Sequence, residues 1–308
     1  MSAPDAHEAT LVLHLRRSRR KARDAAVAEV AALLGDRDGR SLRGGPLSEV
    51  SGLAWVGLDD TPAAVIAERL RFLGYTNAVE LVRPADEVEY PDEAWERARW
   101  TGRDVILVPV YAEPDDALRT GAPDQRSFLL ECGDGVVRRI EGYRGGRGTL
   151  EHRALPVADA RLLVNLVANP SGGRLLDPFA GAGGVVIQAR AAGWRTYSAD
   201  ADPTLRYGLA ELADAHAVAD AAALPLATGS VDAVATEPPY HPMALDTVVG
   251  AVPEIARVLR PGGRASVLVG ADQAEAVRSA GTHAGLTSEL DTPIDRKGTS
   301  VVCMCWGR

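Results

Sequence analysis

A glycine-rich segment near the middle of the chain constrains the fold more than any other feature. It reads Asp177-Pro-Phe-Ala-Gly-Ala-Gly-Gly184, follows the short apolar run 174–176 and opens an apolar, helix-like stretch over residues 185–192. This order predicts a strand, a tight turn and a helix N-terminus. Glycine suits the turn because a side chain would block close approach of the backbone to a ligand. A turn of this kind alone also fits nucleotide-binding units and plain strand-to-helix connections.

Three further segments place acidic residues at the ends of predicted strands. Residues 193–200 form a strand that ends at Asp200, where a doubly wound sheet presents a carboxylate to ribose hydroxyls. A short third strand ends at Asp220, and a fourth, residues 231–236, leads into Glu237-Pro-Pro-Tyr240. Ligands bind outside the carboxyl ends of strands in open α/β sheets, so all four features converge on one crevice.

Together these motifs resemble those of class I S-adenosylmethionine-dependent methyltransferases. More narrowly, they look like the amino-methyltransferases with an Asp-Pro-Phe-x-Gly-x-Gly loop and an Asp/Asn-Pro-Pro-Tyr motif. Residues 155–166 also resemble the lead-in helix of the tRNA guanosine-N2 methyltransferases that carry an N-terminal THUMP-type domain. Two departures stand out. Glu237 takes the place of Asp or Asn, and His241-Pro242 stands where a glycine usually follows the tyrosine.

The resemblance implies an α/β fold, with a Rossmann-like catalytic domain on a mostly parallel seven-stranded sheet over residues 151–308. Alternating strands and helical stretches of ten or more residues support a parallel sheet. Residues 248–259 have helical spacing of apolar residues, and Arg260-Pro-Gly-Gly263 supplies the expected breakers. The remaining expected elements are a strand over 264–270, a helix over 271–280 and closing strands over 286–290 and 300–306, the last antiparallel.

Residues 1–150 are expected to form a smaller α+β domain that selects the substrate. Its strands and helices alternate in a way that suits a THUMP-like or a ferredoxin-like domain, and periodicity does not choose between the two. The predicted strands are 10–15, 53–58, 78–83 and 104–110, the predicted helices 18–34 and 61–73, and the predicted loops 83–103 and 113–124.

The resemblance also implies roles for individual residues. Glu237 would orient an exocyclic amine and stabilise the positive charge that grows on its nitrogen, and Tyr240 would stack on the substrate plane. Of the acids, Asp177 would lie near the methionine end of the cofactor, Asp200 at its ribose and Asp220 at its adenine amine. Read alone, Asp200 and Asp220 would also suit a turn and a solvated strand end. The full catalytic set is Glu237, Pro238, Pro239 and Tyr240, and the S-adenosylmethionine set is Asp177, Pro178, Phe179, Gly181, Gly183, Asp200, Asp220 and Ala221.

Charge bears on the substrate in two opposing ways. Basic residues gather over residues 16–23 and around the glycine-rich stretch 142–148, where Arg144 and Arg147 would hold a phosphate backbone or an anionic small substrate, with His241 at the rim. Against nucleic acid stands the balance of 34 basic and 42 acidic residues, a formal net charge of −8. The leading hypothesis is N-methylation of guanosine in tRNA. A small amine or guanidine metabolite in specialised biosynthesis is the alternative substrate, and a non-catalytic RNA-binding relative is a third possibility.

Composition narrows the setting of the protein. No run approaches the roughly 18 apolar residues of a membrane span, and the N-terminus lacks an apolar signal core, so we expect a cytoplasmic protein without a membrane partner. The three cysteines, Cys132, Cys303 and Cys305, lack the spacing of metal ligands, so we expect no metal site. Nothing in the sequence fixes an oligomeric state.

Overall fold

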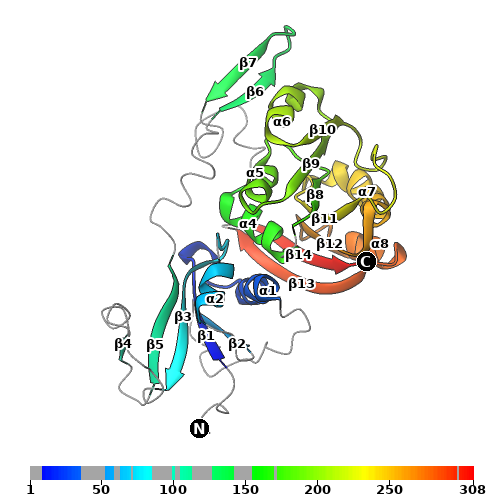
Figure 1. The fold of residues 1–308 in the computed structure, drawn as a ribbon. Helices are drawn as coiled ribbons and strands as arrows, with labels where there is room; N and C mark the ends of the chain where they lie inside the picture. Colours follow the sequence, from blue (N-terminus) through cyan, green and yellow to red (C-terminus); the bar gives the residue numbers. More distant parts are fainter. Residues whose placement is uncertain are drawn as a thin grey trace. The chain divides into compact units, whose positions relative to one another are not determined.

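The chain divides into two compact units, Met1–Asp115 and Asp116–Arg308 (Figure 1). The computed structural model describes residues 9–35, 53–58, 63–70, 72–84, 99–100, 105–112, 127–141, 155–169, 172–296 and 298–308. The sequence suggested a boundary at residue 150, and the two divisions differ in where they place the segment 116–150. None of the described helices is both long and apolar enough to cross a membrane.

An antiparallel sheet with the strand order β2-β1-β3-β5-β4 forms the first unit. The four strands expected here are present, while the two-residue β4 lies in a segment expected to be loop. The expected helix over 18–34 is divided into a short 3-10 turn and α1. The elements are β1 (Ala9–Leu15), η1 (Arg17–Arg19), α1 (Arg23–Leu34), β2 (Leu53–Leu58), α2 (Ala63–Arg69), β3 (Thr76–Pro84), β4 (Arg99–Trp100) and β5 (Val105–Ala112).

Burial of α1 against this sheet explains why the sequence forms a helix there. Ala25, Ala26 and Val30 are fully buried, as is Leu11 of β1. The one buried acid of the helix, Glu29, accepts hydrogen bonds from the backbone N–H groups of Gly74 at 2.6 Å and Tyr75 at 3.0 Å. Because those donors satisfy the carboxylate, Glu29 fixes the turn that precedes β3.

The second unit has a seven-stranded sheet with the order β10-β9-β8-β11-β12-β14-β13. The pairs from β10 through β12 are parallel, and β14 runs antiparallel to both of its neighbours. This confirms the α/β, Rossmann-like fold expected from the sequence. Its strands are β8 (Arg174–Asp177), β9 (Arg195–Asp200), β10 (Ala215–Val218), β11 (Val231–Thr236), β12 (Leu259–Gly270), β13 (Thr287–Arg296) and β14 (Thr299–Gly307).

The order of connection places a crevice at the carboxyl ends of β8 and β11. From β8 the chain moves outward to β9 and β10, then crosses back to β11 on the other side of β8, which makes this the switch point where open α/β sheets bind ligands. The main helices are α4 (Val157–Leu166), α5 (Gly184–Ala191), α6 (Arg206–Leu212), α7 (Leu245–Val258) and α8 (Ala274–His283), and η3 (Pro203–Leu205) and η4 (Pro242–Ala244) are short turns.

Three boundaries differ from those expected. The helix α7 ends at Val258, before the predicted breakers, but the following strand starts at Leu259 and includes them, with a register shift against β11 that accommodates the irregular segment. In addition, β10 stops at Val218, two residues short of Asp220. Finally, β13 runs on to Arg296, well past the expected end at residue 290, and this extension brings an arginine to the site described below.

A hairpin that sequence reasoning missed, β6 (Ser127–Glu131) with β7 (Val137–Glu141), packs on α6 (Figure 1). Phe128 is 1% exposed within the cluster formed with α5 and α6 side chains. A Cβ on Gly208 would lie 2.3 Å from the Phe128 ring, so this helix face is shaped for the ring. The Arg206 Nη2 atom also lies 2.9 Å from Glu131 Oε2. The hairpin is therefore part of the second unit.

Candidate active site

The glycine turn after β8 has the geometry that its sequence predicts. Gly181 and Gly183 have φ angles of +51° and +77°, in the left-handed region that side chains disfavour. A Cβ at Gly183, the N-cap of α5, would also lie 2.5 Å from Leu212 Cδ1, and one at Gly184 would lie 3.3 Å from Leu155. Glycine is thus required both by the backbone and by close packing at the turn.

Asp177 ends β8 with its side chain buried, 1% exposed. Its Oδ1 atom accepts hydrogen bonds from the Thr236 hydroxyl at 2.7 Å and the Phe179 N–H at 3.2 Å. Among the described residues Oδ2 has no hydrogen-bond partner, yet it is not sealed from solvent. Burial raises the pKa of the Asp177 carboxyl to about 7. The two hydrogen bonds act to lower this pKa, and the nearby Asp200 and Glu237 carboxylates act to raise it. Its contact with the cofactor stays a prediction.

Asp200, at the carboxyl end of β9, ties that strand to the glycine turn. Its Oδ2 atom accepts from the Gly181 N–H at 2.8 Å, and its Oδ1 atom accepts from the Asp202 N–H at 2.9 Å. Each carboxylate oxygen can accept more than one hydrogen bond, so both retain capacity for a ligand hydroxyl. The structure therefore places Asp200 beside the turn, and its role at the ribose stays a prediction.

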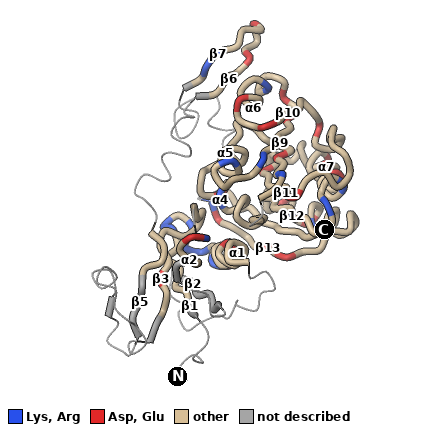
Figure 2. Tube along the Cα trace, viewed as in Figure 1, with Lys and Arg blue, Asp and Glu red and all other residues tan. Residues whose placement is uncertain are grey.

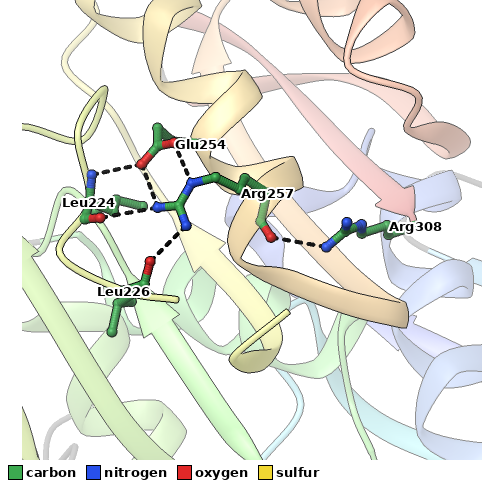
Figure 3. A network of polar contacts seen from close by, with 5 residues as sticks. All are labelled: Leu224, Leu226, Glu254, Arg257 and Arg308. Carbon is green, nitrogen blue, oxygen red and sulfur yellow. Dashed lines mark hydrogen bonds and ion pairs between the residues drawn. The ribbon is translucent and has the colours of Figure 1, made fainter. Parts of the chain in front are cut away.

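The loop after β10 carries Asp220 and is fastened to α7 (Figure 3). The Arg257 guanidinium donates to the carbonyls of Leu226 at 2.7 Å and Leu224 at 3.1 Å. It also pairs with Glu254, whose Oε2 atom accepts from the Leu224 N–H at 2.8 Å. Asp220 itself is exposed, and the neighbouring Ala221 is buried. This anchor defines where the Asp220 loop lies relative to the sheet edge.

The motif that starts at Glu237 follows β11 directly, at the same edge as the glycine turn. Glu237 Oε1 accepts hydrogen bonds from the Tyr240 hydroxyl and from Arg296 Nη1, the latter at 2.6 Å. The Pro239 carbonyl accepts from Gln273 Nε2 at 3.0 Å, so a buried glutamine holds the backbone of the motif. Pro238 is buried, whereas His241 is exposed, as expected for a rim residue.

Arg296 is the residue that sequence reasoning missed. It lies on β13, and its Nε atom is 3.1 Å from Asp159 Oδ2, on the lead-in helix α4. Burial alone would lower the pKa of the Arg296 guanidinium, but the carboxylates of Asp159 and Glu237 outweigh burial and raise it. Four residues from three separate parts of the chain therefore form one polar group, which we call the Arg296 cluster: Asp159, Glu237, Tyr240 and Arg296.

The structure does not test the expected phosphate-binding residues. Arg144 and Arg147 lie outside the described residues. Of the neighbouring arginines, Arg138 pairs with Asp134 at 2.5 Å and Arg139 lies 3.5 Å from Glu211. Figure 2 shows acidic and basic residues interleaved over the second unit. Within the described residues, no group of three or more His, Cys, Asp or Glu side chains is placed to hold a metal ion.

The residues at this edge suit S-adenosylmethionine. The glycines leave the backbone of the turn bare, as a closely bound nucleoside or amino-acid ligand requires. Asp177 Oδ2 is an acceptor of the kind an ammonium group needs. Asp200 at the end of β9 and Asp220 in the loop after β10 supply acceptors of the kind that hydroxyl and amine groups need. The donor and acceptor set thus matches the polar groups of this cofactor, with Glu237 farther along the same edge.

Fold and site together define a class I S-adenosylmethionine-dependent methyltransferase domain. A family model described as "Methyltransferase domain" matches residues 176–267, from the end of β8 into β12. The chain is also 39% identical over 88 residues to a tRNA (guanine(10)-N2)-dimethyltransferase of Methanothermobacter thermautotrophicus. That alignment covers 26% of each chain, so the match spans about a quarter of the curated relative. The cofactor expected from the sequence is confirmed for this domain.

Solved methyltransferase structures resemble about half of this chain at low identity. Geranyl diphosphate C-methyltransferase from Streptomyces coelicolor A3(2) is 16% identical, with a TM-score of 0.42 over 50% of this chain and 76% of that one. The 1,6-didemethyltoxoflavin-N1-methyltransferase from Burkholderia thailandensis is 18% identical, with a TM-score of 0.39 over 49% of this chain and 78% of that one. Neither likeness bears on the substrate of this chain.

Proposed function

We propose that this protein transfers a methyl group from S-adenosylmethionine to an exocyclic amine nitrogen, with guanosine in tRNA as its leading substrate. The observation that carries the proposal is Glu237 Oε2. Both hydrogen bonds to this carboxylate go to Oε1, and Oε2 has no partner among the described residues while remaining open to solvent. An unpaired carboxylate oxygen at the edge that holds the cofactor is the acceptor an amine substrate needs.

The chemistry explains why an acceptor is required. The bound cofactor supplies an electrophilic methyl group on a sulfonium sulfur. The lone pair of an exocyclic base amine is delocalised into the ring, so the amine is a weak nucleophile. Hydrogen bonding from the amine N–H to Glu237 Oε2 would direct the lone pair and stabilise the positive charge that develops as the N–C bond forms and the S–C bond breaks. Glu237 would then accept the released proton or pass it to water.

The rest of the motif would shape the amine pocket. The backbone of the motif has little freedom, because each proline ring restricts its own φ angle and Gln273 holds the Pro239 carbonyl. A proline carbonyl would accept the second N–H of the amine. Tyr240 donates its hydroxyl to Glu237, which orients the ring for stacking on a planar substrate.

The choice of tRNA rests on two observations. The curated relative carries a tRNA guanine N2 activity in its name, and its match covers part of the catalytic domain. Basic residues also gather in the segment that leads into α1, of which Arg17, Arg20 and Lys21 are exposed. The net charge of −8 argues in the other direction and keeps a small amine or guanidine metabolite as the alternative substrate.

Methyl transfer from labelled S-adenosylmethionine to unmodified bulk tRNA, followed by nucleoside mass analysis, tests the substrate. We expect N2-methylated guanosine, and binding that weakens with salt by about 0.7 to 0.9 log units per log unit of salt for each phosphate contacted. Replacing Arg144 and Arg147 by alanine should reduce that slope by about 1 to 2 if both contact phosphates. No tRNA binding at low salt, with transfer to an amine metabolite, would establish the alternative. Tight tRNA binding without transfer would indicate a non-catalytic relative.

Glu237→Gln tests the acceptor. The variant keeps the size of the side chain but loses its charge, so turnover should fall by about 10²-fold while cofactor affinity holds. Glu275→Gln, which removes an exposed carboxylate from the Arg278 ion pair, is the matched control and should leave turnover unchanged. Wild-type turnover in Glu237→Gln would show that the charge of Glu237 has no part in catalysis.

A further inference from the structure

In the Arg296 cluster, the two oxygens of the Glu237 carboxylate differ in their hydrogen bonds. Arg296 Nη1 donates to Glu237 Oε1 at 2.6 Å and lies 2.9 Å from the Tyr240 hydroxyl oxygen, and that hydroxyl donates to the same Oε1. Oε2 is left to whatever enters the crevice. Rotation of the Glu237 side chain about any of its torsions, including the Cγ–Cδ bond, would break the hydrogen bonds from both Arg296 and Tyr240.

The ion pairs of Arg296 with Asp159 and Glu237 lie in the interior of the unit rather than on its surface. The side chain of Asp159 is 0% exposed, that of Arg296 15% and that of Glu237 20%. Asp159 holds the far side of the guanidinium through Nε, so α4, β13 and the motif after β11 are joined through one arginine. Surface arginines rarely hold one geometry, but a guanidinium enclosed between two acids does.

We propose that Arg296 is a positioning residue for methyl transfer, which holds Glu237 through Oε1 as a carboxylate so that Oε2 meets the substrate amine. The inference rests on the proposed function, because it assigns Glu237 the role of amine acceptor. Asp159 is its partner in this role, since it fixes the guanidinium from the side opposite the substrate.

Electrostatics give the arrangement a direction that can be measured. Burial raises the pKa of the Glu237 carboxyl, the Arg296 guanidinium and the Tyr240 hydroxyl oppose that rise, and Asp159 adds to it. Asp177 on β8 also interacts with Glu237. Removal of Arg296 should therefore raise the pKa of Glu237 further, and removal of the Asp159 charge should lower it. These shifts test whether Arg296 holds Glu237 as a carboxylate, and the pH profile of kcat tests whether that contact positions Glu237 for methyl transfer.

The ionisation of Glu237 can be followed without any substrate. In protein labelled with carboxyl-13C glutamate, the Glu237 resonance is assigned by its loss in Glu237→Gln and titrated by NMR. We expect its midpoint to rise by about 1 to 3 pH units in Arg296→Gln and to fall in Asp159→Asn. Arg296→Lys, which keeps the positive charge if the glutamine variant does not fold, should restore most of the midpoint. The matched control is Arg278→Gln, which removes an exposed ion pair to Asp291, a residue of β13 like Arg296. This variant should leave the midpoint of Glu237 unchanged. An unmoved midpoint in Arg296→Gln, or a midpoint in Arg296→Lys shifted as far as in the glutamine variant, would overturn the proposal.

Turnover on bulk tRNA supplies the second readout. In Arg296→Gln the acidic limb of the pH profile of kcat should move upward with the Glu237 midpoint, so activity lost at pH 7 returns at higher pH, while the affinity for S-adenosylmethionine stays constant. Arg296→Lys should recover only part of kcat, because an ammonium cannot bridge Glu237 and Asp159 as a guanidinium does. If the wild type transfers no methyl group to tRNA, the substrate assignment fails, and the NMR titration still decides whether Arg296 holds Glu237 as a carboxylate. A pH profile that stays in place while the midpoint moves would refute the positioning role.

Discussion

Asp177→Asn should make the protein more stable and less able to bind its cofactor. Both hydrogen bonds to Asp177 go to Oδ1, so the amide oxygen of asparagine can accept them from Thr236 and Phe179. What changes is the charge. The pKa of Asp177 rises from an ordinary 3.8 to about 7 because the carboxyl is buried. That difference corresponds to about 4 kcal/mol of stability, present in acid and lost as the pH rises from about 4 through about 7.

Thermal and urea unfolding across pH 4 to 9 measures this effect. At pH 8 the asparagine variant should exceed the wild type by about 2 to 4 kcal/mol, and the two should converge near pH 4, where the carboxyl is neutral. Asp214→Asn is the control of opposite sign. Asp214 accepts a hydrogen bond from the Thr196 N–H, which holds the pKa of this carboxyl below its usual range. Asp214→Asn should therefore be less stable than the wild type at neutral pH and equally stable in acid. Parallel curves for wild type and Asp177→Asn would refute the reasoning.

Cofactor binding gives the other half of the test. If Asp177 Oδ2 accepts from the ammonium group of S-adenosylmethionine, affinity in the wild type should increase as the pH passes about 7, where the carboxyl ionises. In Asp177→Asn the affinity should be lower above pH 7 and nearly independent of pH. Calorimetry at pH 6 and 8 measures both quantities. Equal affinities for the two proteins at pH 8 would remove Asp177 from the cofactor site.

Two further predictions concern the turn and the adenine side of the site. Gly183→Ala should lower the stability measured by thermal unfolding more than Gly193→Ala does. Both glycines have positive φ, but only a Cβ at Gly183 meets a side chain, at 2.5 Å. Equal losses of stability would show that α6 shifts to accommodate the Cβ at little cost. Arg257→Ala removes the two carbonyl contacts that fasten the Asp220 loop and should weaken S-adenosylmethionine binding by about 5- to 30-fold, the equivalent of about 1 to 2 kcal/mol. Arg260→Ala, which loses only the ion pair to a surface acid, should bind normally, and equal affinities in the two variants would contradict the anchoring role.

The fold of the second unit could be predicted because its strands are short apolar runs with clear ends. The fourth expected strand coincides with β11, since an apolar run is closed by Glu-Pro-Pro, which cannot continue a parallel ladder. The β6–β7 hairpin could not be predicted, because it is stabilised by Phe128 inserting at Gly208, some eighty residues away. Isolated hairpins are marginal in water, so local sequence carries little signal for one that depends on a distant helix.

The site could be predicted only where its residues follow strands. Asp177 and Asp200 each end a strand and Glu237 directly follows one, so one rule about parallel sheets brings them to one edge. Arg296 obeys no such rule. It lies on β13, a largely polar strand at the edge of the sheet next to β14, and nothing local distinguishes it from the exposed arginines of the chain. Only the antiparallel return of β14, which sets how far β13 extends, places its guanidinium beside Glu237.

The departure of Glu237 from the Asp or Asn expected at its position, and the presence of Arg296, have one chemical explanation. An amide at this position needs no counter-charge, whereas a buried carboxylate is costly unless it is paired. The additional methylene of glutamate extends its carboxylate toward β13, where Arg296 provides that pair and Asp159 in turn pairs the guanidinium. Since Arg296 already offsets the charge of Glu237, in the proposed function Oε2 would serve mainly as a directed hydrogen-bond acceptor rather than as an isolated anion. Such an acceptor would suit a neutral exocyclic amine better than a substrate bound chiefly through its positive charge, and this is why we propose guanosine ahead of a cationic guanidine metabolite.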